Sequence, residues 1–89
     1  MEAIIEGNKI FNVNDFHKSL KVALNLPEYY GENLDALWDC ITGQIEMPTT
    51  IIWKDFAISQ KYLGGYSDKV LQLFKDAEHE IANFKIIID

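Results

Sequence analysis

The sequence contains no arginine, and its 14 acidic side chains outnumber eight lysines to give a formal net charge of −6 over 89 residues. Proteins that bind nucleic acids need guanidinium or ammonium groups to displace counterions from the phosphates. We therefore expect no direct contact with DNA or RNA. The charge balance favours a positively charged partner instead.

Cysteine is also scarce, since Cys40 is the only one, which excludes an intrachain disulfide and is compatible with a reducing compartment. We expect Cys40 to be a small buried hydrophobe and not a reactive thiol. The opening MEAIIEG lacks the basic and long apolar regions of a signal peptide, and no apolar run approaches the ~20 residues that cross a bilayer. These absences predict a soluble, cytoplasmic protein without a membrane partner.

The chain also lacks the motifs of metal and cofactor sites. There is no D-x-D-x-D-G calcium loop, G-x-G-x-x-G, P-loop or nucleophile elbow. His17 and His79 fall on separate predicted helices without a recognisable partner, and we expect both at the surface. No metal and no cofactor is predicted.

Three apolar or β-branched stretches are typical of strands: residues 1–7, ended by a turn at Gly7-Asn8, residues 49–53, and residues 84–89. The last is apolar enough to be buried on both faces. Helices are predicted after a cap at Asn12 or Asn14, after a cap at Asn33, over one or two turns within 55–63, and from Ser67 to about residue 83. This alternation predicts one α/β domain, residues 1–89, with a small three-stranded parallel sheet and helices packed on it.

The helix after Asn33 separates apolar from acidic residues. At 100° per residue, one side carries Leu34, Leu37 and Ile41, while Asp35 and Asp39 lie well away from it, and Trp38 and Thr42 lie between. Gly43 stands where a C-terminal glycine is common. The macrodipole favours Asp35 by about 0.3–1 kcal/mol, but Asp39 lies beyond the first turn, and its repulsion with Asp35 costs about 0.2–0.5 kcal/mol. A solvated face is the simplest explanation, but a binding surface would explain this cost.

Two further features support a binding surface. Asp76 and Glu80 lie one turn apart at the C-terminal end of the last helix, where the helix dipole disfavours them. Tyr29 and Tyr30 stand in the loop between Pro27 and Gly31, and tyrosine is a frequent interface anchor. We expect at least one of the two rings to cover the core.

The run LPEYYGENLDALWD, residues 26–39, continuing to ITG, resembles the barstar family, intracellular inhibitors of secreted ribonucleases of the barnase type. The resemblance extends from the EAIIEG stretch through HKSLKVALN, Pro48, Trp53 and VLQLFKDAE to the terminal FKIIID. It implies a barstar-like fold and a one-to-one complex in which the second helix and the preceding loop block the active site of the ribonuclease. The acids of the inhibitor would meet the cations that otherwise hold RNA phosphate.

The resemblance also implies roles for single residues. Asp39 would occupy the phosphate position, Asp35 would make a second ion pair, and Tyr29 would lie on the catalytic histidine of the partner. The remaining implied contacts are Gly31, Asn33, Trp38, Thr42, Gly43, Gln44, Asp76 and Glu80. Gln44 stands where the family has a tryptophan, Asp76 where it has a glutamate and Ala82 where it has a second cysteine, and Pro48 resembles a cis-proline of the family.

These observations predict an inhibitor of a basic, extracellular, barnase-like ribonuclease that is a monomer when free. The alternative is a barstar-like module that binds a different basic protein or toxin. An enzyme is disfavoured, because hydrolysis by the pair Asp35 and Asp39 would need an enclosed, partly apolar site, and the predicted helix flank is open.

Overall fold

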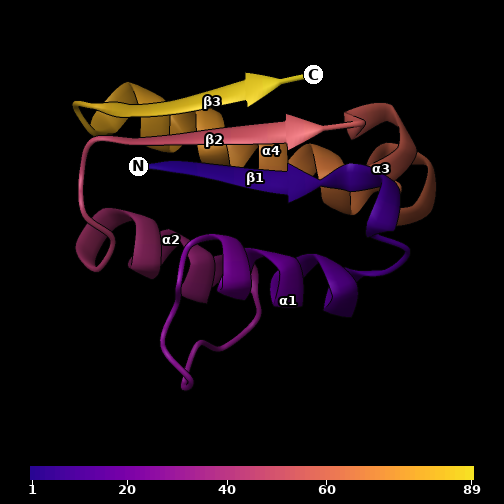
Figure 1. The fold of residues 1–89 in the computed structure, drawn as a ribbon, viewed down its shortest axis with the longest axis horizontal. Coiled ribbons are helices and arrows are strands. Elements are labelled where there is room, and N and C mark those ends of the chain that lie inside the picture. The colour runs from indigo at the N-terminus through magenta and orange to yellow at the C-terminus, as the bar shows by residue number, and fades with distance from the viewer.

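In the computed structural model, which describes residues 1–89, three parallel strands form one sheet in the order β1-β2-β3. The strands are β1 (Glu2–Glu6), β2 (Thr49–Lys54) and β3 (Phe84–Ile88) (Figure 1). The helices are α1 (Val13–Ala23), α2 (Leu34–Gly43), α3 (Phe56–Leu63) and α4 (Gly65–Glu80), with a short 3-10 turn η1 (Gly7–Lys9) after β1. The predicted α/β fold with a three-stranded parallel sheet is confirmed.

The helices cover one face of the sheet. Parallel strands are joined by right-handed crossovers, so in the order β1-β2-β3 both connections lie on the same face. Figure 1 shows α4 behind the strands and α1 and α2 on the β1 side of the sheet. Ala3 and Ile5 of β1 and Ile51 and Trp53 of β2 are buried on the covered face, and their strand neighbours are not. At the centre, the Trp53 ring stacks on Phe16 of α1 at 5.3 Å between centroids.

The prediction that the last strand is buried on both faces is wrong. Phe84 is buried, but Lys85 and Ile87 are exposed because no helix covers the second face of the sheet. The apolar run FKIII therefore reflects one core-facing row of side chains and one open row, and not a central strand between two helical layers.

The helix ends depend on local hydrogen bonds. Asn12, one of the two predicted caps, accepts the Asp15 N–H at 2.8 Å, and Asn33 accepts the Ala36 N–H at 2.8 Å. The start of α4 differs from the prediction, since the helix begins at Gly65 and buried Ser67 donates its hydroxyl to the Gly64 carbonyl. Its end also comes earlier, at Glu80, and Asn83 lies outside it with a φ of 70°.

A chain of two hydrogen bonds connects β2 and α3 to the turn that follows β1. The Trp53 indole N–H donates to Ser59 Oγ at 3.0 Å, and Ser59 donates to the Gly7 carbonyl at 3.0 Å. A Cβ on Gly7 would lie against the Lys54 carbonyl and 2.7 Å from Ser59 Oγ, so only glycine fits here.

The Met47–Pro48 bond is cis, as the family resemblance implied. None of the helices is long and apolar enough to span a bilayer.

Candidate functional site

The loop from Pro27 to Asn33 is tied to the start of α2. The Asn33 amide nitrogen donates to the Gly31 carbonyl at 3.2 Å, while its oxygen caps the helix. A Cβ on Gly31 would lie 3.1 Å from the Ala36 side chain, which makes a larger residue there difficult to place. Asn33, predicted as a partner contact, therefore has a structural task in the free protein.

The predicted separation of apolar and acidic residues on α2 is confirmed. Leu37, Cys40 and Ile41 are buried, and Trp38 is half-buried against the core. The exposed flank carries Asp35, Asp39 and Thr42, followed by Gly43 and Gln44. Gly43 is the last helical residue and has no positive φ, and the backbone N–H of Gln44 donates to the Cys40 carbonyl at the helix end.

No basic side chain of this protein forms an ion pair with the acids on this flank of α2. Lys21 and Glu28, 3.3 Å apart, form the one ion pair in the protein. Asp35 and Asp39 are therefore exposed and unpaired, so their charge is available to another molecule. Two like charges at i,i+4 destabilise a helix, so the stability of the fold does not explain why Asp35 and Asp39 are both acidic.

Helix α4 packs beside α2 and adds its own acids to the surface. Trp38, Asp76, His79 and Glu80 line a hollow of about 320 Å³ between the two helices. A neighbouring hollow of about 370 Å³ is lined by Asp35, Trp38 and Asp76 together with Leu34, Lys69, Gln72 and Leu73. The structure thus brings Asp35 of α2 and the α4 acids Asp76 and Glu80, 41 or more positions apart in the sequence, together beside Trp38.

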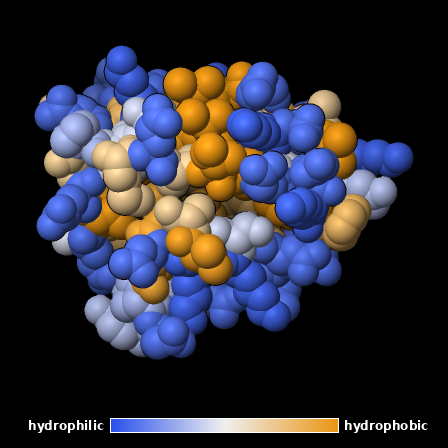
Figure 2. All heavy atoms as spheres, in the orientation of Figure 1, coloured by the Kyte–Doolittle hydropathy of each residue, from blue (hydrophilic) through white to orange (hydrophobic).

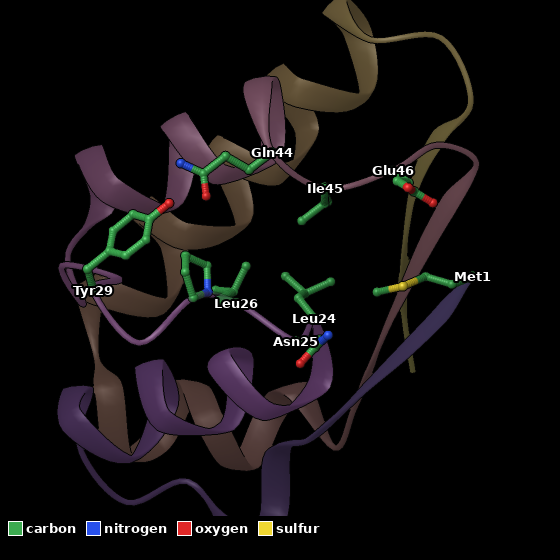
Figure 3. Close-up of a pocket in the computed structure, with 9 residues that line it drawn as sticks. Met1, Leu24, Asn25, Leu26, Tyr29, Gln44, Ile45 and Glu46 are labelled. Carbon is green, nitrogen blue, oxygen red and sulfur yellow. The ribbon is translucent and has the colours of Figure 1, made fainter.

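The other side of α2 faces the loop. Tyr29, Tyr30, Gly31, Asp39 and Gln44 are among the residues that line a small hollow of about 160 Å³. A larger hollow of about 490 Å³ adjoins it, and Figure 3 shows Tyr29 and Gln44 pointing toward one another at one end and Met1 and Glu46 at the other. Of the predicted site residues, Asn33, Thr42 and Gly43 line none of these hollows, and the Thr42 hydroxyl donates to the Trp38 carbonyl at 2.8 Å.

A family model described as Barstar (barnase inhibitor) matches residues 1–88. The chain belongs to the barstar family. It is similar to the Bacillus subtilis (strain 168) protein named "Putative ribonuclease inhibitor YrdF", with 46% identity over 87 residues that cover 97% of this chain and 96% of that protein. The family resemblance on which the residue roles were based is therefore confirmed, while the roles themselves stay predictions.

In this barstar-family chain the two tyrosines of the loop have different tasks. Tyr29 is 77% exposed, and Tyr30 is buried, which confirms that one ring covers the core. The Tyr30 hydroxyl lies 2.7 Å from Nδ1 of His17, and the Tyr66 hydroxyl lies 2.7 Å from Nε2 of the same ring. The expectation that His17 is at the surface is wrong, because it is fully buried between two tyrosines from distant segments.

This network fixes the charge state of His17. Burial lowers its pKa below the ordinary 6.5, and the nearby Glu32 carboxylate offsets only part of that effect. Burial raises the pKa of both tyrosine hydroxyls. The neutral imidazole therefore donates to one hydroxyl and accepts from the other. The Tyr30–His17 contact anchors the loop that presents Tyr29 to the solvent.

The environment of Cys40 confirms the prediction that this residue is a small buried hydrophobe. Cys40 is buried, and burial, with a smaller effect of Asp39, raises the pKa of its thiol. A protonated thiol is a poor nucleophile. No group of three or more His, Cys, Asp or Glu side chains is close enough together to hold a metal ion.

Sequence reasoning did not find Lys69, Gln72, Leu73 and His79, which line the α2–α4 hollows. The signal was present, because these positions continue the spacing of Asp76 and Glu80 along one stripe of α4. The sequence does not show that this stripe of α4 packs beside α2.

Proposed function

We propose that this chain is a protein inhibitor of a ribonuclease, and that its target is a basic, extracellular enzyme of the barnase type. Helix α2 and the loop before it would enter the active site of the enzyme in a one-to-one complex. The support from comparison is membership of the barstar family and the similarity to a protein named as a ribonuclease inhibitor.

The observation that carries the proposal is the exposed acidic surface that α2 and the C-terminal part of α4 form together. Asp35 and Asp39 on α2 and Asp76 and Glu80 on α4 are all exposed, and none is in an ion pair. A ribonuclease must hold phosphate with cationic side chains, so its active site is the complementary surface. Carboxylates placed there form charge-assisted hydrogen bonds and exclude the RNA.

Inhibition in this proposal is steric and electrostatic, and no bond is cleaved. Asp39, which shares a hollow with Tyr29 and Gly31, would take the place of an RNA phosphate, and the exposed Tyr29 ring would cover a catalytic side chain of the enzyme. The net charge of −6 would also attract a basic partner over distance. Association should therefore be fast and should slow as salt is raised.

The test is a titration of ribonuclease activity. A fixed amount of a barnase-type ribonuclease is mixed with increasing amounts of the chain, and the residual cleavage of RNA is measured. We expect activity to fall linearly to an end point at one equivalent. Loss of inhibition with retained capture of another basic protein would favour the second candidate, a binding module for a non-nuclease partner.

Asp39→Asn and Asp55→Asn make a matched pair of variants for this titration. Both remove one negative charge, but Asp55 is an exposed residue with a φ of 52° at the far end of β2, where asparagine is equally acceptable. Leaving a buried cation of the partner unpaired costs about 2–5 kcal/mol or more in charged interfaces, of which the barnase–barstar complex is itself a standard example. Asp39→Asn should thus weaken inhibition by roughly 30-fold or more. Equal inhibition by the two variants would remove Asp39 from the site.

A further inference from the structure

The hollow of about 490 Å³ beside α2 lies where the C-terminal ends of two helices come together. Its walls are mainly the residues that follow α1, Leu24, Asn25 and Leu26, and those that follow α2, Gln44, Ile45 and Glu46. Asn25 has a φ of 52°, and the N–H of Leu26 donates to the Lys21 carbonyl at 2.9 Å, which ends α1 in a tight turn. Figure 3 shows Leu24 and Ile45 facing one another in the middle of the hollow.

The hollow combines an apolar floor with one charged side chain. Leu24 and Leu26 are buried, and Ile45 is half-buried. Glu46 is the one charged side chain among the lining residues, and it is exposed and in no ion pair. The amino group of Met1 donates to the Pro48 carbonyl and forms no ion pair with Glu46. Within this protein, therefore, no cation pairs with the Glu46 carboxylate.

The backbone adds to the negative potential of the hollow. The C-terminal end of a helix carries about half an elementary negative charge. At the end of α2 the N–H groups of Gln44 and Ile45 both donate to the Cys40 carbonyl, and the last turn contains no basic residue. The basic residue in the last turn of α1, Lys21, is paired with Glu28. Two helix ends and one carboxylate thus favour a cation in the hollow.

The hollow is continuous with the proposed contact surface of α2. Pro27, Tyr29 and Gln44 line both this hollow and the smaller one that includes Asp39. The Cys40 thiol donates to Oε1 of Gln44 at 3.7 Å, so the Gln44 amide lies against α2 at the border between the two hollows. Hydrophobic atoms also reach the surface over the strands (Figure 2), but that face of the sheet is turned away from the helices.

We propose that a lysine or arginine of the inhibited ribonuclease enters this hollow beside Tyr29 and Gln44. Its aliphatic stem packs on the apolar floor, and its charged end lies near Glu46 and the two helix ends. The Cα atoms of Gln44 and Glu46 are at most about 7 Å apart, a distance that a long basic side chain spans. This inference rests on the proposed function, because it names a contact of the same complex. Gln44 then determines which ribonucleases fit.

The test of the cation uses the barnase-type ribonuclease that the chain inhibits most strongly, and it measures the dissociation rate of the complex. Glu46→Gln should raise this rate roughly 3- to 10-fold, because the cation loses its partner. Glu6→Gln, an equal charge change at an exposed position on the opposite end of β1, should leave the dissociation rate unchanged. Weaker long-range attraction slows association in both variants, so the dissociation rate separates a direct contact from net charge.

Variants of Gln44 test the route by which the side chain enters. The indole of Gln44→Trp is larger than the amide and should close the border between the hollows. In that background Glu46→Gln should change the dissociation rate by less than about twofold, because the basic side chain no longer reaches the carboxylate. Gln44→Ala keeps the border open, so the full effect of Glu46→Gln should remain.

Two results would overturn this inference. One is an equal dissociation rate for Glu46→Gln and Glu6→Gln. The other is an effect of Glu46→Gln that is as large with Gln44→Trp as with Gln44→Ala. Both results leave the proposed function intact, which the separate titration of Asp39→Asn tests. A chain that inhibits no barnase-type ribonuclease would overturn both proposals. Thermal melts check that every variant is folded.

Discussion

Replacing Tyr30 by phenylalanine removes one oxygen atom from the contact that anchors the binding loop. The ring and its apolar contacts with the core are kept, so hydrophobic burial is almost unchanged. What is lost is the hydroxyl 2.7 Å from Nδ1 of His17. Because His17 is fully buried, one nitrogen of its ring is left without a partner.

The cost follows from that unpaired nitrogen. Leaving a buried polar group unsatisfied costs about 1–3 kcal/mol. For a domain of this size each kcal/mol lowers Tm by roughly 4–8 °C, so we expect a decrease of roughly 4–24 °C. The matched control is Tyr29→Phe, whose side chain is mostly exposed and has no hydrogen bond, and which should change stability by about 0.5 kcal/mol at most.

Urea and thermal unfolding followed by circular dichroism, at a pH above 6.5, measure both variants. A second background sharpens the test. In a His17→Leu protein the Tyr30 hydroxyl has itself lost its partner, so Tyr30→Phe should there be neutral or stabilising. If Tyr30→Phe is as harmless as Tyr29→Phe, or costs the same with and without His17, the reasoning about the buried imidazole is refuted.

Three further outcomes follow from the same structure. Since burial lowers the pKa of His17, the unfolded chain binds more protons below pH 6.5, so urea midpoints should fall as the pH drops below that value, and His17→Gln should flatten the slope. Gly7→Ala should cost about 2 kcal/mol or more in thermal unfolding because its Cβ would clash with the backbone carbonyls of Lys54 and Asp55 and with Ser59 Oγ, whereas Gly65→Ala, with open space around it, should not destabilise. Asn33→Ala should cost about 0.5–2 kcal/mol of stability in urea unfolding because the helix cap is lost. Asn33→Ser should keep most of that stability, because serine also caps helices. If the serine variant nevertheless inhibits more weakly than the wild type, the Asn33 amide contacts the partner.

The features of α2 could be predicted because they depend on residues within four positions of one another. A helical period places Asp35 and Asp39 together and away from Leu37, and the Asn33 cap bonds a backbone N–H three residues later. The same reasoning gives the wrong start for α4, because the residue type of Ser67 predicts a cap. In the structure it is a buried hydroxyl in the first turn.

By itself the sequence determined the strands and helices, the acidic flank of α2 and the resemblance to the barstar family. Only the tertiary structure decided that His17 is buried, since its partners Tyr30 and Tyr66 lie 13 and 49 positions away along the chain. It also decided that Asp76 and Glu80 adjoin Trp38 and that β3 has one open face. Period and capping act locally, whereas these three outcomes depend on which faces of distant segments pack together, and no local pattern carries that information.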